Sequence, residues 1–251
     1  MLRTTIAAIT LTLFVLIAGP LLLLYTCATG RPDFMYRVGS QGVFLIGRLV
    51  GLRTQVEGRE NVPAGTVLFL ANHTSFIDPV PIVEALPRRV AILAKESLFK
   101  IPVVGWAFWL AGFVPVNRSS RESAIESVEK AAQRLKAGTS FLAYPEGTRS
   151  YDGRLLPFKR GVFVMAIRAG VPIVPMVAIG VHRLMPKGTW KIRPGRVWVR
   201  FGEPIETSSY SLEERAVLMN RVRSAMSVLL PADQQALASE LPDTMPPHEG
   251  A

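Results

Sequence analysis

Cysteine, aromatic side chains and acidic residues are all scarce in this chain. One cysteine among 251 residues excludes a disulfide-stapled fold and every metal site that needs several thiolates. Aromatic residues make up only 8%, and no motif typical of RNA- or DNA-binding domains is present, so no nucleic-acid partner is expected. Lysine and arginine (29) outnumber aspartate and glutamate (19), and the net charge of +10 favours anionic partners such as lipid head groups or phosphorylated substrates.

Charge is also absent from the N-terminal segment. No charged residue lies between Arg3 and Arg31, and roughly 20 apolar residues suffice for a helix to cross a bilayer. A Gly-Pro pair interrupts this run near its middle, so a kink or a re-entrant pair of helices is an alternative to a straight helix. A cleaved signal peptide ending near Cys27 is another, although its apolar region is usually shorter. We expect residues 1–30 to be a hydrophobic membrane anchor.

The next segment, residues 31–52, combines arginines with an apolar face. On a helix, Arg37 and Arg48 share one side with two further polar residues, and Phe44 makes that side imperfect. This pattern is typical of an amphipathic helix lying in the membrane interface, and an ordinary core-packing helix is the alternative. More positive charge follows the anchor than precedes it, which predicts a cytoplasmic main domain.

Short apolar runs alternate with amphipathic stretches between residues 53 and 230. We expect central strands at 67–71, 90–94, 113–116, 140–144 and 173–177, and an edge strand at 196–201. Helices are predicted from Ser119 or Ser120 onward, over 161–168 and over 212–230. This alternation predicts an α/β domain over residues 53–230. The proline-rich residues 231–251 are predicted to be a flexible C-terminal tail.

The first polar cluster directly follows the apolar run at 67–71. In Asn-His-Thr-Ser-Phe-Ile-Asp-Pro, Asp78 precedes a proline that suits the first position of a helix, so His73 lies on a strand-to-helix loop. Asp78 is then placed to reach back to His73. A carboxylate on one imidazole nitrogen leaves the other nitrogen free to act as a base. The alternative is that Asp78 only caps the helix.

A second cluster, Val-Pro-Val-Asn-Arg, places Arg118 just ahead of a predicted helix. A guanidinium beside a helix N-terminus forms an anion site, and a solvated arginine is the alternative. The prolines of a further motif, Val-Pro-Ile-Val-Pro at 171–175, predict an edge or wall strand rather than the centre of a sheet.

The remaining cluster, Tyr-Pro-Glu-Gly-Thr-Arg-Ser at 144–150, ends a predicted buried strand. Gly147 lets a ligand approach the backbone closely. Arg149 is able to hold a phosphate, and Glu146 and Thr148 are able to hydrogen-bond hydroxyl groups.

These four motifs, in this order over roughly residues 55–205, resemble those of the glycerolipid acyltransferases, and most closely the bacterial 1-acyl-sn-glycerol-3-phosphate acyltransferase family. The resemblance implies an α/β domain with a mixed central sheet flanked by helices, behind the membrane-anchoring segment. It implies that His73 is the general base and Asp78 its partner. Tyr144 stands where the family often has phenylalanine. The residues implied around the glycerol phosphate are Lys95, Arg118, Glu146, Gly147, Thr148 and Arg149.

The reaction implied by the resemblance is a direct acyl transfer in phospholipid biosynthesis. The donor is an acyl thioester, acyl-CoA or acyl carrier protein, and the acceptor is the sn-2 hydroxyl of 1-acyl-sn-glycerol 3-phosphate (lysophosphatidic acid). The product is phosphatidic acid, made at the cytoplasmic side of a bacterial inner membrane. No metal and no cofactor are expected, and a backbone N–H near the His73 loop is expected to stabilise the oxyanion.

Two alternatives to this reaction remain at this point. One is acylation of another acceptor, either glycerol 3-phosphate or a phosphate-free lyso-lipid such as a lyso-ornithine lipid. The other is a non-enzymatic, membrane-anchored lipid-binding protein. The apolar stretch at 101–113, with its two tryptophans, is a candidate path for the acyl chain, or part of the core.

Overall fold

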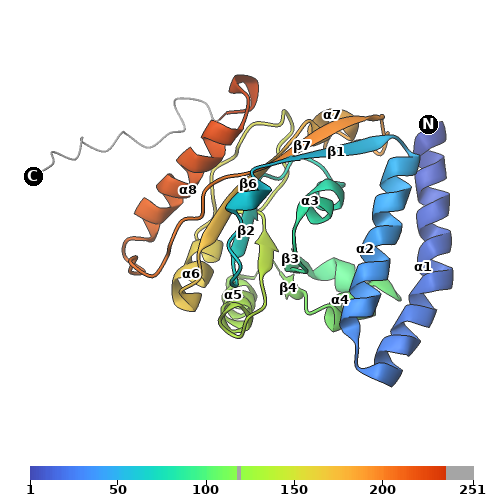
Figure 1. The fold of residues 1–251 in the computed structure, drawn as a ribbon, viewed down its shortest axis with the longest axis horizontal. Coiled ribbons are helices and arrows are strands. Elements are labelled where there is room, and N and C mark those ends of the chain that lie inside the picture. Colours follow the sequence, from blue (N-terminus) through green and yellow to red (C-terminus); the bar gives the residue numbers. More distant parts are fainter. Residues whose placement is uncertain (118–119, 236–251) are drawn as a thin grey trace, which may run out of the picture.

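A computed structural model describes residues 1–117 and 120–235. Two helices come first, α1 (Leu2–Thr29) and α2 (Pro32–Leu49), and they run antiparallel at one end of the molecule (Figure 1). The uncharged N-terminal run is one continuous helix with Pro20 inside it. Arg118 and most of the predicted tail lie outside the described residues.

A seven-stranded sheet forms the centre of the remaining chain, in the order β1-β7-β6-β2-β5-β3-β4. Its strands are β1 (Leu52–Glu57), β2 (Leu68–Ala71), β3 (Ala91–Lys95), β4 (Val114–Val116), β5 (Phe141–Ala143), β6 (Ile173–Ile179) and β7 (Gly195–Phe201). Neighbouring strands from β6 to β4 are parallel, whereas β7 runs antiparallel to β6 and parallel to β1. The predicted mixed central sheet is therefore confirmed.

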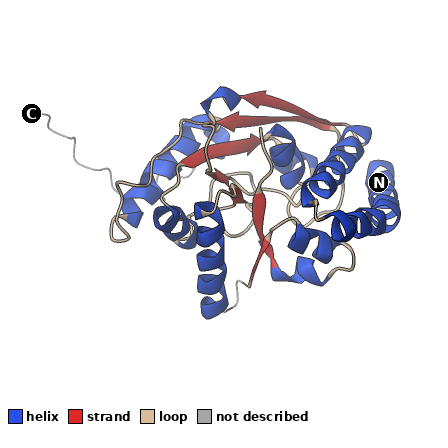
Figure 2. Cartoon of the chain, turned by 60° about the horizontal axis from the view of Figure 1, so that its bottom comes forward, coloured by secondary structure: helices blue, strands red, loops and turns tan. Residues whose placement is uncertain are grey.

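Helices cover both faces of the sheet (Figure 2). The longer helices are α5 (Arg121–Lys136), α6 (Gly161–Ala169) and α8 (Arg215–Leu229), and the shorter ones are α3 (Pro79–Ala85), α4 (Val104–Leu110) and α7 (Val181–Leu184). Short segments of 3-10 helix lie at Arg59–Asn61, Glu96–Lys100 and Ala232–Gln234. The cap of α5 is Ser120, whose hydroxyl accepts the Ser123 amide.

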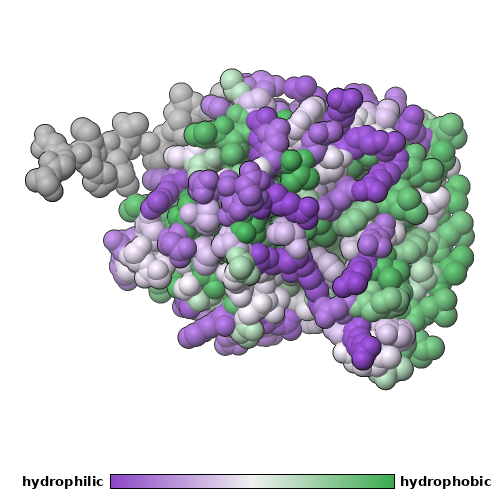
Figure 3. Space-filling model, viewed as in Figure 1, coloured by the Kyte–Doolittle hydropathy of each residue, from purple (hydrophilic) through white to green (hydrophobic). Residues whose placement is uncertain are grey.

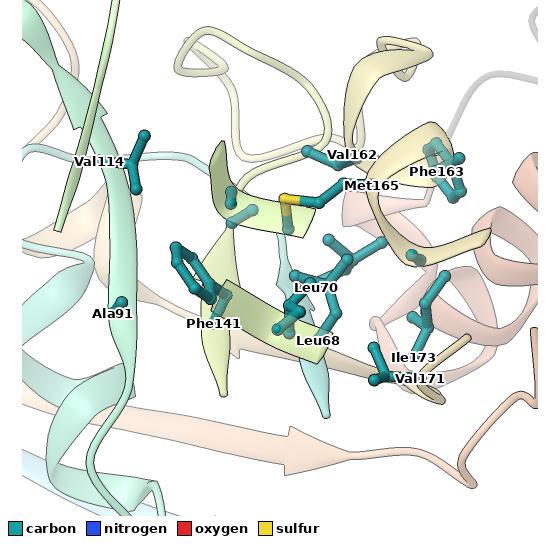
Figure 4. Close-up of a cluster of buried hydrophobic side chains, with 14 of the residues drawn as sticks. Leu68, Leu70, Ala91, Val114, Phe141, Val162, Phe163, Met165, Val171 and Ile173 are labelled. Atoms are coloured by element: carbon teal, nitrogen blue, oxygen red, sulfur yellow. The ribbon is translucent and has the colours of Figure 1, made fainter. Parts of the chain in front are cut away.

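Two buried hydrophobic clusters hold these layers together, one on each face of the sheet. Leu68 and Leu70 of β2 pack in the cluster that also contains side chains of α5, α6 and α8 (Figure 4). The alternate residue Phe69 packs in the other cluster, with side chains of α3 and α7. Because successive strand residues point to opposite faces, the continuous apolar run of β2 marks a strand that is covered on both sides.

Three predictions about strand position are wrong. The strand at 113–116, expected among the central strands, is β4, the last strand at one edge of the sheet. The strand at 196–201, expected at an edge, is β7, which lies between β1 and β6. The proline-flanked strand, expected at an edge or wall, is β6, next to the centre of the sheet. The carbonyl of Pro175 accepts a bond from Gly202, so its ring nitrogen faces the same side, where pairing with β7 begins only at Met176. The missing N–H therefore interrupts no ladder.

The edge strand β1 was not among the predicted strands. Only Leu52 of this strand is buried, and charged or polar side chains make up most of the rest. An edge strand with one buried residue has no apolar alternation for the sequence to reveal.

Candidate active site

The proposed site residues follow neighbouring parallel strands at the same end of the sheet. His73 lies two residues after β2, Glu146 lies on the loop after β5, and Lys95 is the last residue of β3. The strands β2, β5 and β3 are adjacent in the sheet. Carboxyl ends of parallel strands are where α/β sheets bind ligands, so sequence segments far apart are brought to one edge.

His73 and Asp78 form a hydrogen-bonded pair within one loop. The Nδ1 atom of His73 is 2.8 Å from Oδ2 of Asp78, which is fully buried. The same carboxylate accepts the backbone amides of Thr74 at 2.6 Å and Ser75 at 2.8 Å. With a carboxylate on Nδ1, that nitrogen carries the proton and Nε2 is the free, basic nitrogen. The His73 side chain is 16% exposed, so a substrate has access to it.

Asp78 precedes α3 without capping it. Its side chain makes no hydrogen bond to the first turn of the helix, which begins at Pro79. All the bonds of the carboxylate point back into the loop, to His73, Thr74 and Ser75. The alternative that Asp78 only caps the helix is therefore wrong. The spacing between His73 and Asp78 instead brings the carboxylate to the imidazole and the amides of its own loop.

Glu146 lies beneath this loop and is nearly fully buried. One oxygen accepts the His73 amide at 2.7 Å and the other accepts the Leu156 amide at 3.0 Å. Burial raises the pKa of Glu146 to about 8, although the two amide bonds oppose that rise. Both oxygens accept bonds inside the protein, so this buried carboxyl group holds the backbone of His73 and is not exposed to a substrate hydroxyl.

Tyr144 is a site residue to which the sequence assigned no role. Its ring stacks on the His73 imidazole, with centroids 4.1 Å apart and planes 21° apart. Its hydroxyl is buried and has no hydrogen-bond partner within the described residues. Burial, with a smaller contribution from the Asp78 charge, raises the pKa of this phenol well above its ordinary value. The ring, rather than the hydroxyl, is the part in contact with His73.

The turn after Glu146 presents groups to the sheet edge. Gly147 adopts φ +69°, a left-handed conformation that favours glycine. Thr148 is exposed and Arg149 is half-buried. The Arg149 carbonyl accepts a bond of 2.6 Å from Lys187. Neither Arg149 nor Lys95 has a carboxylate partner within the described ranges, so both cations are available to an anionic ligand.

Two further contacts fix the loop to the rest of the domain. Asn72 bonds both the amide and the carbonyl of Ala178 on β6, at 2.7 and 3.2 Å. The Ser75 hydroxyl donates to the Met185 carbonyl at 2.7 Å. These contacts join residues more than a hundred positions apart in sequence, so only the adjacency of Asn72 and Ser75 to His73 could have pointed to them.

The expected oxyanion donor is not one of the first amides of the loop. The His73 amide is bonded to Glu146, and the Thr74 and Ser75 amides are bonded to Asp78. A tetrahedral oxyanion therefore takes its hydrogen bonds from other donors. In the part of the chain that the structure describes, no group of three or more histidine, cysteine or acidic side chains is arranged to hold a metal ion.

Comparison with known proteins identifies relatives of this chain by sequence. Residues 53–179 match the family model described as Acyltransferase. A 1-acyl-sn-glycerol-3-phosphate acyltransferase of Limnanthes douglasii is 32% identical over 213 residues, which cover 83% of this chain and 75% of that protein. The chloroplastic enzyme BAT2 of Brassica napus, of the same name, is 37% identical over 163 residues, 64% of this chain and 47% of that protein.

A solved structure extends the likeness to three dimensions. The crystal structure of PlsC from Thermotoga maritima, a 1-acyl-sn-glycerophosphate (LPA) acyltransferase, superposes with a TM-score of 0.71 at 30% sequence identity. The superposition covers 90% of this chain and 92% of that one.

Proposed function

This chain belongs to the acyltransferase family, and we propose that it transfers a fatty acyl group from an acyl thioester to the sn-2 hydroxyl of 1-acyl-sn-glycerol 3-phosphate, giving phosphatidic acid. The observation that carries the proposal is the His73–Asp78 pair at the carboxyl edge of the sheet, where Lys95 and Arg149 have no carboxylate partner among the described residues. The relatives that carry this activity in their names support the choice of acceptor.

The chemistry follows from the free nitrogen of His73. Nε2 removes the proton from the sn-2 hydroxyl as its oxygen forms a bond to the thioester carbon. The tetrahedral intermediate then collapses, the carbon–sulfur bond breaks, and the proton passes from the imidazolium to the departing thiolate. Asp78 keeps Nδ1 protonated and stabilises the imidazolium. Transfer of this kind needs no covalent enzyme intermediate and no cofactor.

The acceptor is recognised by charge. Lys95 ends β3 and Arg149 lies on the loop that follows the adjacent strand β5, and a phosphate monoester suits both cations. Arg118 continues the same edge in sequence, after β4, and its position lies outside the described residues. We assign the phosphate to Lys95, Arg118 and Arg149, with Gly147 and Thr148 lining the turn beside it.

Among the residues that the structure describes, one helix, α1, is long and apolar enough to cross a membrane. Its outward side forms the continuous hydrophobic surface at one end of the molecule in Figure 3. The other side packs on the domain, where Phe14 faces Gly42 of α2 and Val103 faces Gly19. Because α1 packs along α2, we assign both helices to the cytoplasmic leaflet of a bacterial inner membrane. In this arrangement α1 is embedded in the leaflet, and the edge of the sheet that carries His73 lies outside it.

An acceptor panel tests the proposed function. The purified chain is incubated with a labelled acyl thioester, as acyl-CoA or as acyl carrier protein, and with one acceptor at a time. We expect phosphatidic acid from 1-acyl-sn-glycerol 3-phosphate as the main product, identified by mass spectrometry. Faster acylation of glycerol 3-phosphate or of a phosphate-free lyso-lipid would show that the proposed acceptor is wrong. Binding of lipid without any transfer would show that the protein binds lipid and is not an acyltransferase.

A further inference from the structure

The loop between α7 and β7, residues 186–194, touches the segments on both sides of the site. We name it the entrance loop. Its Trp190 packs edge-to-face on Phe76, three residues after His73, with ring centroids 5.7 Å apart. Its Lys187 donates to the carbonyl of Arg149 at 2.6 Å. The entrance loop therefore contacts both the loop that carries His73 and the turn that carries Arg149, the cation assigned to the phosphate.

The same loop is continuous with the apolar end of the molecule. The Ile192 amide donates to the hydroxyl of Thr4, in the first turn of α1, at 2.9 Å. Arg3 of the same turn donates to the Val50 carbonyl at 2.9 Å, just after α2. In Figure 1 this loop, before β7, lies beside the N-terminal end of α1. The entrance loop thus links the segments that carry His73 and Arg149 to the first turn of the apolar helix.

The exposed side chains of the entrance loop, together with the neighbouring Phe76 of the His73 loop, suit a lipid surface. Trp190 is 71% exposed and Phe76 is 50% exposed, although both are large aromatic rings. Lys191 and Arg193, on either side of Ile192, are exposed as well. Exposed tryptophan flanked by basic residues is the composition of segments that lie at the level of lipid head groups.

We propose that the entrance loop is a second membrane-contact surface, at which Trp190 enters the interface of an anionic bilayer while Lys191 and Arg193 meet lipid phosphates. This contact holds the mouth of the site at the surface where the acceptor lies, and in that respect it rests on the proposed function. The partner is the lipid bilayer, because the loop adjoins the apolar surface of α1 and carries the opposite charge to anionic lipid.

Depth-dependent quenching tests the proposal without using turnover. In a full-length variant with Trp106→Phe, Trp109→Phe and Trp198→Phe, Trp190 is the only tryptophan. The probe is a vesicle of phosphatidylcholine and phosphatidylglycerol with bromine on the upper or the lower part of the acyl chains. We expect the fluorescence of Trp190 to shift to shorter wavelength and to be quenched more by the upper bromines.

A matched probe on the far side of the molecule gives the control. Val228 is 82% exposed on α8, at the end of the fold away from α1 (Figure 1). In the same background with Trp190→Phe, Val228→Trp is expected to stay open to an aqueous quencher while the protein is bound. If Trp190 on bound protein is as accessible to that quencher as the Val228→Trp probe, the proposal is wrong.

Charge variants separate lipid from an acidic protein as the partner. We expect Lys191→Gln with Arg193→Gln to weaken binding to anionic vesicles about tenfold. Lys136→Gln with Arg221→Gln removes the same charge from α5 and α8 and is expected to bind as wild type. If the Lys191/Arg193 variant binds vesicles normally and is instead impaired in using acyl carrier protein with a soluble acceptor, the surface belongs to that donor and the proposal is overturned.

Discussion

The loop that carries His73 and the helix pair α1–α2 are built by opposite means. In the loop, one buried carboxylate, Asp78, accepts bonds from an imidazole, a hydroxyl and two amides. Along α1, large apolar side chains face outward, and few polar contacts join the helix to the domain. The loop has the internal hydrogen bonds of a rigid site, whereas the helix pair lacks the cover that apolar groups need in water. We therefore expect substitutions in the loop to lower turnover without affecting membrane binding, and substitutions on α1 to weaken membrane binding without affecting the chemistry.

Substitution of Asp78 disrupts the loop that carries His73 without altering the helix pair, and it has the largest expected effect on turnover and stability together. Asp78→Ala leaves two buried amides without an acceptor and frees the His73 ring, so we expect turnover to fall by about 10² or more and stability by about 1–3 kcal/mol for each unpaired amide. Steady-state rates and thermal melts measure both. Asp233→Ala, which removes the exposed partner of Arg183, is the control and should change neither. Normal turnover by folded Asp78→Ala would remove this residue from the mechanism.

Removing Arg149 separates acceptor binding from the chemistry of the loop. Loss of one charged phosphate contact costs about 1.5–3 kcal/mol, so Arg149→Ala should raise the acceptor KM by about 10–100-fold. The donor KM should stay unchanged. Arg154→Ala is the matched control, because that arginine lies further along the same loop and is paired with Asp152. An equal rise in both Michaelis constants, or a rise for the donor only, would contradict the assignment.

Glu146 sharpens the comparison through its pH dependence. Its folded pKa of about 8 lies above the ordinary 4.5, so between these values the folded state holds a proton that the unfolded state has released. The resulting stability is present below pH 4.5 and is lost as pH rises through 8. Thermal melts of wild type should show this decline, and those of Glu146→Gln should lack it.

Glu146→Gln is also expected to lower the stability of the folded protein directly. The glutamine NH₂ faces a backbone donor, which should lower stability by about 1–3 kcal/mol. Glu206→Gln, on an exposed residue, should keep the wild-type profile. If Glu146→Gln and wild type decline in parallel, Glu146 does not hold the proton.

Tyr144 gives the smallest expected effect, and a test of its positioning role. Tyr144→Phe keeps the ring on His73 and removes a buried hydroxyl that has no partner in the described chain. Its turnover should stay within about twofold of wild type. Tyr144→Ala should lower kcat and leave both KM values unchanged, because the imidazole loses its stacking partner. A similar defect in both variants would assign a role to the hydroxyl instead.

The sequence was informative where one local pattern carried the information. The apolar runs of β2 and β5 predicted buried strands, and the spacing of His73 and Asp78 predicted a pair within one loop. It was uninformative where the partner is distant. Nothing local shows that Glu146 bonds the amides of His73 and Leu156, or that Pro175 lies opposite Gly202, just beyond the end of β7. These contacts arise from the packing of strands and loops far apart in the chain.

The separation of chemistry from membrane contact is tested most directly by measuring vesicle binding and phosphatidic acid formation together. The comparison uses His73→Ala and a variant with Ile17→Asp and Leu21→Asp, two exposed positions on α1. His73→Ala should bind vesicles as wild type does and lose about 10²–10⁴ of turnover on vesicles and on a soluble short-chain acceptor alike. The α1 variant should lose vesicle binding and keep turnover on the soluble acceptor. Turnover by His73→Ala above about a tenth of wild type, or equal loss on both acceptors in the α1 variant, would contradict the account.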